Sequence, residues 1–191
     1  MPARICAACS KPAALLCSSC QDAWYCSKAC QIKDFDSHEP ICGMWYFWYT
    51  KYSVVDRIKK KNYLSTLYKL LVNNELSNAL SQTGKNFTVF APTDRAFERI
   101  ADTVAKLSAS QVKEVLLYHV HSGSAVDSKQ AIKLGMSNTA IPMMQGLQAT
   151  LRTEGKKLYI NNAQVVKPDM RAYNGVVHII DTVLVPPSFS T

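Results

Sequence analysis

The sequence predicts an α+β fold in which helices come first and strands later, preceded by a small cysteine-rich module. Three observations predict it. All seven cysteines lie between Cys6 and Cys42. Apolar residues then recur at three- and four-residue steps through residues 54–83, as on the buried face of a helix. After Gly123, short apolar runs alternate with turn signals, as in antiparallel strands.

The cysteine-rich segment has the spacing of a metal site, C-x2-C-x7-C-x2-C-x5-C-x3-C-x7-H-x3-C. The candidate ligands are Cys6, Cys9, Cys17, Cys20, Cys26, Cys30, His38 and Cys42. An odd number of cysteines cannot pair completely into disulfides, and thiolates and imidazole are the usual ligands of structural zinc. Eight ligands make two closed tetrahedra, so the sequence predicts two zinc ions that fold the segment without performing chemistry. Spacing alone does not choose between sequential and interleaved pairing of the ligands.

Residues 6–42 resemble a MYND-type zinc finger, on the motifs Tyr25-Cys26-Ser27-x-x-Cys30-Gln31 and His38-x-x-x-Cys42. The resemblance implies a cross-braced finger with interleaved ligation. One zinc would be held by Cys6, Cys9, Cys26 and Cys30, and the other by Cys17, Cys20, His38 and Cys42.

The MYND resemblance also implies that the finger binds proline-rich peptides in a groove beside a short helix. The matching groove positions are Ser27, Gln31 and Phe35. Many relatives have Trp at the position of Phe35, so an aromatic surface remains here without the indole donor. The alternative, that Phe35 only packs the small core, stays open.

An aromatic run follows the finger, with six of the eighteen aromatic residues inside 45–52. A flexible linker would instead be rich in Gly, Ser or Pro. In one interpretation the run packs the finger against the next domain. In the other it contacts a partner protein through Trp45, Phe47, Trp48 and Tyr49, because Trp and Tyr dominate binding hot spots. Contact with a membrane surface is a third interpretation.

The formal charge of +8 is unevenly distributed. Residues 1–42 carry four Lys or Arg against four Asp or Glu, so the excess belongs to residues 43–191. Part of it is a local run of five basic residues against Asp56 alone: Lys51, Arg57, Lys59, Lys60 and Lys61. Lysines on a helix ordinarily form a solvated face, so we do not expect nucleic acid as a partner.

The larger domain is expected to begin with two helices in residues 54–83, separated at Asn73-Asn74. A strand at 87–90 follows, then a helix capped by Thr93 or Asp94. Another helix starts near Ser108 or Ser110 and runs to His119. Strands joined by turns at 154–156 and 161–162 are expected at 147–151, 157–160, 163–166 and 175–180.

This region resembles a fasciclin-like domain over residues 53–187. The motifs are Phe87-Thr88-Val89-Phe90-Ala91-Pro92-Thr93-Asp94-x-Ala96-Phe97, Tyr118-His119, and Asn174-Gly175-Val176-Val177-His178-Ile179-Ile180-Asp181-x-Val183-Leu184. The resemblance implies a compact β-sheet wedge with helices packed around it, in a binding or adhesive module. Tyr118 and His119 lie on an apolar helix face, so we expect satisfied core residues there.

The expected domains are a zinc finger at 1–43, an aromatic linker at 44–53, the fasciclin-like domain at 54–187 and a tail at 188–191. The sequence shows no phosphate loop, nucleophile elbow or paired-carboxylate motif. No apolar h-region precedes Cys6, and no apolar run approaches the roughly 18 residues that span a bilayer, so we expect neither a signal peptide nor a membrane-spanning helix.

We therefore predict a non-enzymatic, cytoplasmic interaction or scaffold protein. It would be a structural subunit of a larger hetero-complex, with the cilium or cytoskeleton as its location. The alternative is a nuclear transcription or chromatin adaptor that binds proline-rich peptides through the zinc finger.

Overall fold

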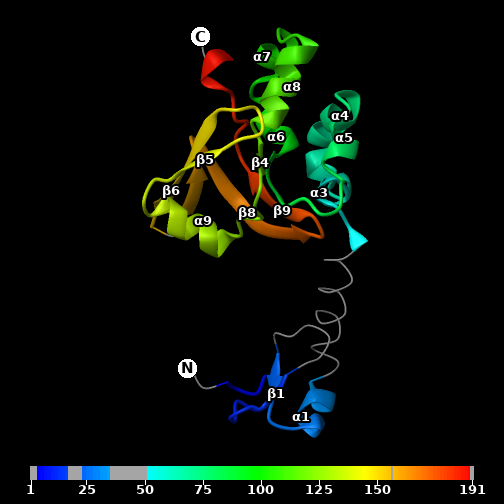
Figure 1. Cartoon of the computed structure of the whole chain (residues 1–191), viewed down its shortest axis with the longest axis vertical. Helices are drawn as coiled ribbons and strands as arrows, with labels where there is room; N and C mark the ends of the chain where they lie inside the picture. Colours follow the sequence, from blue (N-terminus) through cyan, green and yellow to red (C-terminus); the bar gives the residue numbers. More distant parts are fainter. Residues whose placement is uncertain (1–3, 17–22, 35–50, 156, 190–191) are drawn as a thin grey trace. The chain divides into compact units, whose positions relative to one another are not determined.

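The computed structural model describes residues 4–16, 23–34, 51–155 and 157–189 (Figure 1). Its contacts divide the chain into two compact units, Met1–Lys51 and Tyr52–Thr191, which are described one at a time. In the described ranges, no helix is long and apolar enough to cross a membrane.

The N-terminal unit contains a short hairpin and one helix. Strands β1 (Leu15–Leu16) and β2 (Trp24–Tyr25) pair antiparallel, and helix α1 (Lys28–Lys33) follows. Ser27 caps α1, because its hydroxyl accepts the backbone N–H of Cys30 at 3.3 Å. The fully buried apolar residues described here are Cys6 and Tyr25. So small a core needs a second source of stability.

The C-terminal unit is built on one mixed seven-stranded sheet, in the order β4-β3-β9-β8-β7-β6-β5. The strands are β3 (Phe87–Pro92), β4 (Val120–Ser122), β5 (Ala140–Pro142), β6 (Gln148–Glu154), β7 (Lys157–Ile160), β8 (Ala163–Ala172) and β9 (Gly175–Ile180). The central strands β3 and β9 run parallel, although they come from the beginning and the end of the unit. Their other neighbours pair antiparallel.

The sheet curls until its two edge strands meet. Met144, just after β5, donates its backbone N–H to the carbonyl of Val120 in β4 at 2.7 Å. Nδ1 of His121 in β4 donates to the carbonyl of Pro142 in β5, also at 2.7 Å. The result is the nearly closed wedge seen in Figure 1, which confirms the predicted α+β fold class.

Helices cover the two faces of the wedge. They are α3 (Val54–Lys59), the 3₁₀ turn η1 (Asn62–Leu64), α4 (Ser65–Asn73), α5 (Leu76–Ala79), α6 (Asp94–Glu98), α7 (Ala101–Ala105), α8 (Ala109–Leu117), α9 (Ser128–Gly135) and the 3₁₀ turn η2 (Pro187–Phe189). One apolar cluster joins α3–α6 and α8 to β3 and β9, and a second lies between α9 and β5–β7. Consecutive side chains of a strand point to opposite faces of the sheet. In β3, Val89 therefore belongs to the first cluster and Phe90 to the second.

Two details of the predicted element list were wrong. The region 54–83 holds three α-helices and a 3₁₀ turn in place of two helices, with a break near Lys60 as well as the expected one beside Asn74. Helices α7 and α9 and strands β4 and β5 were not predicted, and α9 was missed because only strands were expected after Gly123. A Cβ on Gly135 would lie 2.9 Å from Cγ2 of Thr153, so the last turn of α9 packs very closely on β6.

Candidate metal centre

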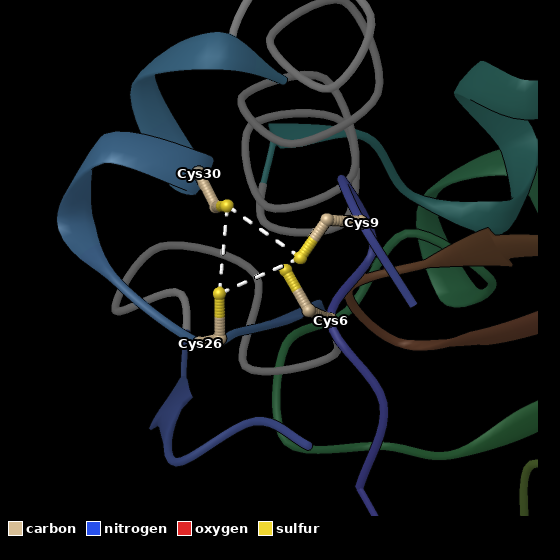
Figure 2. A group of neighbouring side chains, drawn as sticks. All are labelled: Cys6, Cys9, Cys26 and Cys30. Atoms are coloured by element: carbon tan, nitrogen blue, oxygen red, sulfur yellow. Dashed lines mark hydrogen bonds between the residues drawn. The ribbon is translucent and has the colours of Figure 1, made fainter. Parts of the chain in front are cut away.

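Four of the predicted zinc ligands lie together in the N-terminal unit. The Sγ atoms of Cys6, Cys9, Cys26 and Cys30 are all within 4.8 Å of one another (Figure 2). Cys6 and Cys9 come from the turn before β1, whereas Cys26 follows β2 and Cys30 lies on α1. The structure thus brings together the four residues that the MYND resemblance assigns to one zinc.

The sulfur–sulfur distances fit a tetrahedral zinc site. They are 3.5 Å for Cys9–Cys26, 3.4 Å for Cys26–Cys30 and 3.7 Å for Cys30–Cys9. Sulfurs at the corners of a tetrahedron, each about 2.3 Å from zinc, would lie about 3.8 Å apart. A disulfide would instead bring two sulfurs to about 2 Å, and all four cysteines are free thiols. Four soft thiolates at this spacing suggest zinc binding.

Backbone hydrogen bonds place the first cysteine pair opposite the second. The N–H of Cys6 donates to the carbonyl of Lys11 at 2.8 Å, and the N–H of Ser10 donates to the carbonyl of Cys6 at 2.9 Å. Ser10 closes this turn in the left-handed region, with φ at 58°. The N–H of Ala7 donates to the carbonyl of Trp24 at 2.9 Å, which joins the turn to β2.

The Cys6 thiol is held in the form that binds metal. Burial alone would raise its pKa, but hydrogen bonds from the backbone of Cys26 and Ala8 outweigh burial. The net effect lowers the pKa of Cys6 from 9.0 to about 6. A thiol with that pKa is mostly thiolate at neutral pH, and the thiolate is the ligand.

Half of the predicted site lies outside the described residues. This applies to the second ligand set and to the aromatic residues expected to contact peptide or partner: Cys17, Cys20, His38, Cys42, Phe35, Trp45, Phe47, Trp48 and Tyr49. A second zinc therefore stays a prediction. In the described ranges, no other group of three or more His, Cys, Asp or Glu side chains converges closely enough to hold a metal.

Two of the predicted peptide-binding residues are described. The Ser27 hydroxyl is used to cap α1 and contacts the Cys26 thiol at 3.9 Å, so it is committed to the finger itself. Gln31 lies one turn along α1, half-buried, and its side chain makes no hydrogen bond to the described residues. Ile32 beside it is 67% exposed. Peptide binding by Ser27 and Gln31 stays a prediction, and of the two only Ser27 has a side chain that bonds to other described residues.

The buried histidine of the Tyr118-His119 motif serves the fold. Nδ1 of His119 donates to the carbonyl of Val115 at 2.7 Å, and Nε2 accepts the N–H of Leu184 at 2.9 Å. Burial lowers its pKa to about 4, against a weaker opposite effect of the Val115 bond. The Tyr118 hydroxyl donates to the carbonyl of Gln148 at 2.9 Å. Both side chains are 1% exposed, which confirms the prediction of satisfied core residues.

The other ionisable residues inside this unit are also engaged by its own structure. Nε2 of His178 donates to the carbonyl of Val126 at 2.8 Å, and Nδ1 accepts the N–H of Asp169 at 3.3 Å. Asp94 accepts two backbone N–H groups and a hydroxyl from the first turn of α4, while Thr93 caps α6. No buried side-chain nitrogen or oxygen in the described part of the chain lacks a hydrogen-bond partner. These groups are therefore explained by folding.

Two family models match the chain, in the order that the sequence predicted. The MYND finger model matches residues 6–42 and the Fasciclin domain model matches residues 62–186. The match to the first agrees with the four-cysteine cluster, and the match to the second covers the sheet wedge.

Several known proteins are similar to the second unit. The chain is 34% identical over 128 residues to "Protein sll1483" of Synechocystis sp., covering 64% of this chain and 67% of that protein. It is 28% identical over 138 residues to Periostin of Homo sapiens, which covers 71% of this chain and 16% of Periostin. It is 34% identical over 131 residues to Cell surface glycolipoprotein MPB83 of Mycobacterium bovis, with 65% and 56% covered. The chain thus spans only part of each relative.

Among solved structures, the domain pair from the insect cell adhesion molecule Fasciclin I has the same fold. The TM-score is 0.64 at 20% sequence identity, and the match covers 74% of this chain and 53% of that one. At this identity the similarity shows the fold alone.

Proposed function

Because this chain belongs to the fasciclin domain family and carries a MYND finger ahead of that domain, we propose that it is a non-enzymatic protein–protein interaction protein. Both are non-catalytic interaction or adhesion domains. The observation that carries the proposal is the four-thiol cluster. A zinc bound there has protein sulfur at every corner and no open position for water or substrate, so it orients α1 and does no chemistry.

The proposed setting is a larger intracellular assembly, in which this chain is a structural subunit of a hetero-complex. Support comes from the four thiols, which stay reduced and able to bind metal in a reducing compartment. Two interaction modules on one chain can also bind two sites of an assembly at the same time. The linkage raises the overall affinity above that of either module alone. The cilium or the cytoskeleton is the specific location we propose.

Localisation and complex size of the tagged full-length chain test this proposal. We expect a cytoplasmic, ciliary or cytoskeletal signal, and migration on gel filtration well above the 21.3 kDa of a monomer. Cys26→Ser should abolish the large complex, because it removes one corner of the cluster, whereas Lys33→Ala on the exposed side of α1 should keep it. A purely nuclear signal, or migration of the wild type as a monomer in cell extract, would count against a scaffold.

A second candidate is a nuclear transcription or chromatin adaptor that binds proline-rich peptides through the finger. It is favoured by one observation, the Gln31 side chain on α1, which makes no hydrogen bond to the described residues and lies next to the exposed Ile32. Calorimetric titration of the zinc-loaded chain with a proline-rich peptide tests it. Binding that is lost in Gln31→Ala and kept in Lys33→Ala supports the adaptor, and equal binding by both variants removes it.

A further inference from the structure

We infer that the fasciclin unit carries a docking surface for an acidic protein segment. The surface, called the basic patch here, consists of Arg57, Lys59, Lys60 and Lys61 at the C-terminal end of α3. Helix α3 lies beside α4 and packs against β8 and β9 (Figure 1). Lys59 and Lys60 are exposed, and Lys61 and Arg57 are half-buried.

The helical layer that carries the patch has strongly unbalanced charge. Residues 52–74 contain five basic residues and a single acidic one, Asp56. The Asp56 carboxylate is already used in the capping box of α3, where it accepts the N–H of Ser53 at 2.9 Å and its hydroxyl at 2.7 Å. Within the described ranges, neither Lys59 nor Lys61 takes part in an ion pair. The ammonium groups of Lys59 and Lys61 therefore present positive charge that the described carboxylates do not neutralise.

Helix capping alone does not account for this charge. Cations near the last turn of a helix interact favourably with its exposed carbonyl groups. Helix α3 is only six residues long, however, and four cations lie at or just beyond its last turn. One or two cations would satisfy the carbonyls at that end, so helix capping does not explain all four.

Aromatic rings hold two of the ammonium groups in place. Lys60 Nζ lies 3.4 Å from the centre of the Tyr52 ring, and Lys59 Nζ lies 5.7 Å from that of Tyr68 on α4. Arg57 is anchored through Nε, which donates to the carbonyl of Arg171 at 2.6 Å. Cations whose positions are set in advance lose less freedom when a ligand binds.

The geometry favours an acidic protein segment over nucleic acid. Single-stranded nucleic acid binds by stacking its bases on open aromatic faces, and here the cations of the patch lie over the rings of Tyr52 and Tyr68. A duplex-binding protein typically neutralises about 6–10 phosphates, more than this patch can reach. Alternate side chains of an extended peptide are about 6.7 Å apart on one side, which lets successive carboxylates reach neighbouring cations.

A membrane surface is also a poorer match. Binding to lipid at an interface requires a broad apolar face next to the cations. Among the described residues of this layer, the exposed large apolar side chains are Tyr63 and Val72, which are 38% and 44% exposed. They offer too little apolar area to anchor the unit in lipid.

The inference rests on the proposed interaction function and adds a partner chemistry, on the fasciclin unit and not on the finger. The test uses the zinc-loaded full chain and a fluorescein-labelled peptide of alternating Glu and Ser, followed by fluorescence anisotropy. The matched peptide has Gln at every Glu. The patch variant is Lys59→Gln with Lys60→Gln and Lys61→Gln. Its control is Lys113→Gln with Lys129→Gln and Lys133→Gln, which removes the same charge from exposed positions on α8 and α9.

We expect the acidic peptide to bind and the Gln peptide not to bind. The patch variant should weaken binding about tenfold, because three charge pairs are lost, and the control variant about twofold or less. Binding should also weaken between about 0.01 M and about 0.15 M salt, as the screening length shortens from about 30 Å to about 8 Å. Arginine at the three patch positions should keep the affinity, and melting curves should show that every variant is folded.

Equal weakening in the patch variant and its control would overturn the inference, because the effect would then be one of net charge. So would tighter, patch-dependent binding of a single-stranded oligonucleotide or of vesicles containing phosphatidylserine, which would assign the patch to nucleic acid or to membrane. The acidic peptide could fail to bind while the zinc-dependent complex of the full chain persists. That result would contradict the inference of an acidic partner and would leave the proposed interaction function supported.

Discussion

Mild acid should destabilise the fasciclin unit before its carboxylates are protonated, because His119 is buried as a neutral imidazole. Its Nδ1–H donates to Val115 and its Nε2 accepts from Leu184. A second proton on Nε2 would break the bond from Leu184 and place a charge in a site with no counter-ion. Burial accordingly lowers the pKa of His119 from 6.5 to about 4.

The size of the effect follows from proton linkage. Between pH 6.5 and pH 4 the unfolded chain binds a proton at His119 and the folded chain does not. The free energy of unfolding therefore falls as the pH falls, by about 1.4 kcal/mol per unit and about 3 kcal/mol over the window. His178 adds to the loss, because burial lowers its pKa as well. The pKa of Asp94 is lowered as well. Its carboxylate contributes to the free energy of unfolding at every pH above its ordinary pKa of 3.8, and this contribution is lost only below that value.

Hydrogen exchange of the β3 and β9 amides measures this loss in the fasciclin unit independently of the finger. Between pH 7 and pH 4, wild type should lose about 3 kcal/mol more than His119→Gln, which cannot titrate in this range. The control Lys113→Gln changes only an exposed side chain on α8 and should follow wild type. Equal losses in wild type and His119→Gln would refute the reasoning. So would a nuclear magnetic resonance titration that places the pKa of His119 near 6.5.

Three further outcomes are expected. Removing zinc with a chelator should unfold the finger and leave the fasciclin unit folded. Native mass spectrometry should show two zincs per chain beforehand, and a disulfide-bonded, metal-free mass would contradict the zinc assignment. Asn174→Ala should lower the free energy of unfolding in urea by about 3 kcal/mol, because the buried amide accepts from Val54 N–H at 2.9 Å and donates to the Leu80 carbonyl at 2.8 Å. A cost under about 1 kcal/mol would show that water replaces these bonds. Gly175→Ala should prevent folding of the fasciclin unit, because a Cβ there would lie 2.0 Å from the Phe87 carbonyl oxygen at a φ of +151°. A variant with the wild-type melting temperature would rule out that clash.

Local signals were enough to predict many elements of the fold. Ser108 caps α8 in a capping box with Gln111. Asn161, with φ at 49°, lies in the tight turn that connects β7 to β8. The same kind of signal precedes α9, where Asp127 and Gln130 form a capping box. This helix was missed because only strands were expected in a region dominated by short alternating runs. A cap search independent of apolar periodicity would have found it.

Long-range pairing could not be read from local signals. The parallel contact of β3 with β9 joins the two ends of the unit, and no turn or cap between them specifies it. The cysteine site has the same difficulty. Both sequential and interleaved pairings satisfy the ligand spacing, and only the hairpin of β1 and β2 brings Cys26 back beside Cys9. Family resemblance, not spacing, supplied the interleaved set.

The fasciclin motif residues described here work inside the fold. Asn174 ties the first turn of α3 to the end of α5, Gly175 lets β9 approach β3, and His119 and His178 satisfy buried backbone groups. A motif whose members face inward identifies the family without specifying a ligand. The partner contact that we propose therefore involves exposed side chains that no motif includes, such as Lys59 and Lys60 at the end of α3. Two fasciclin domains with the same interior can then bind unrelated partners, and surface charge is the feature by which they should be compared.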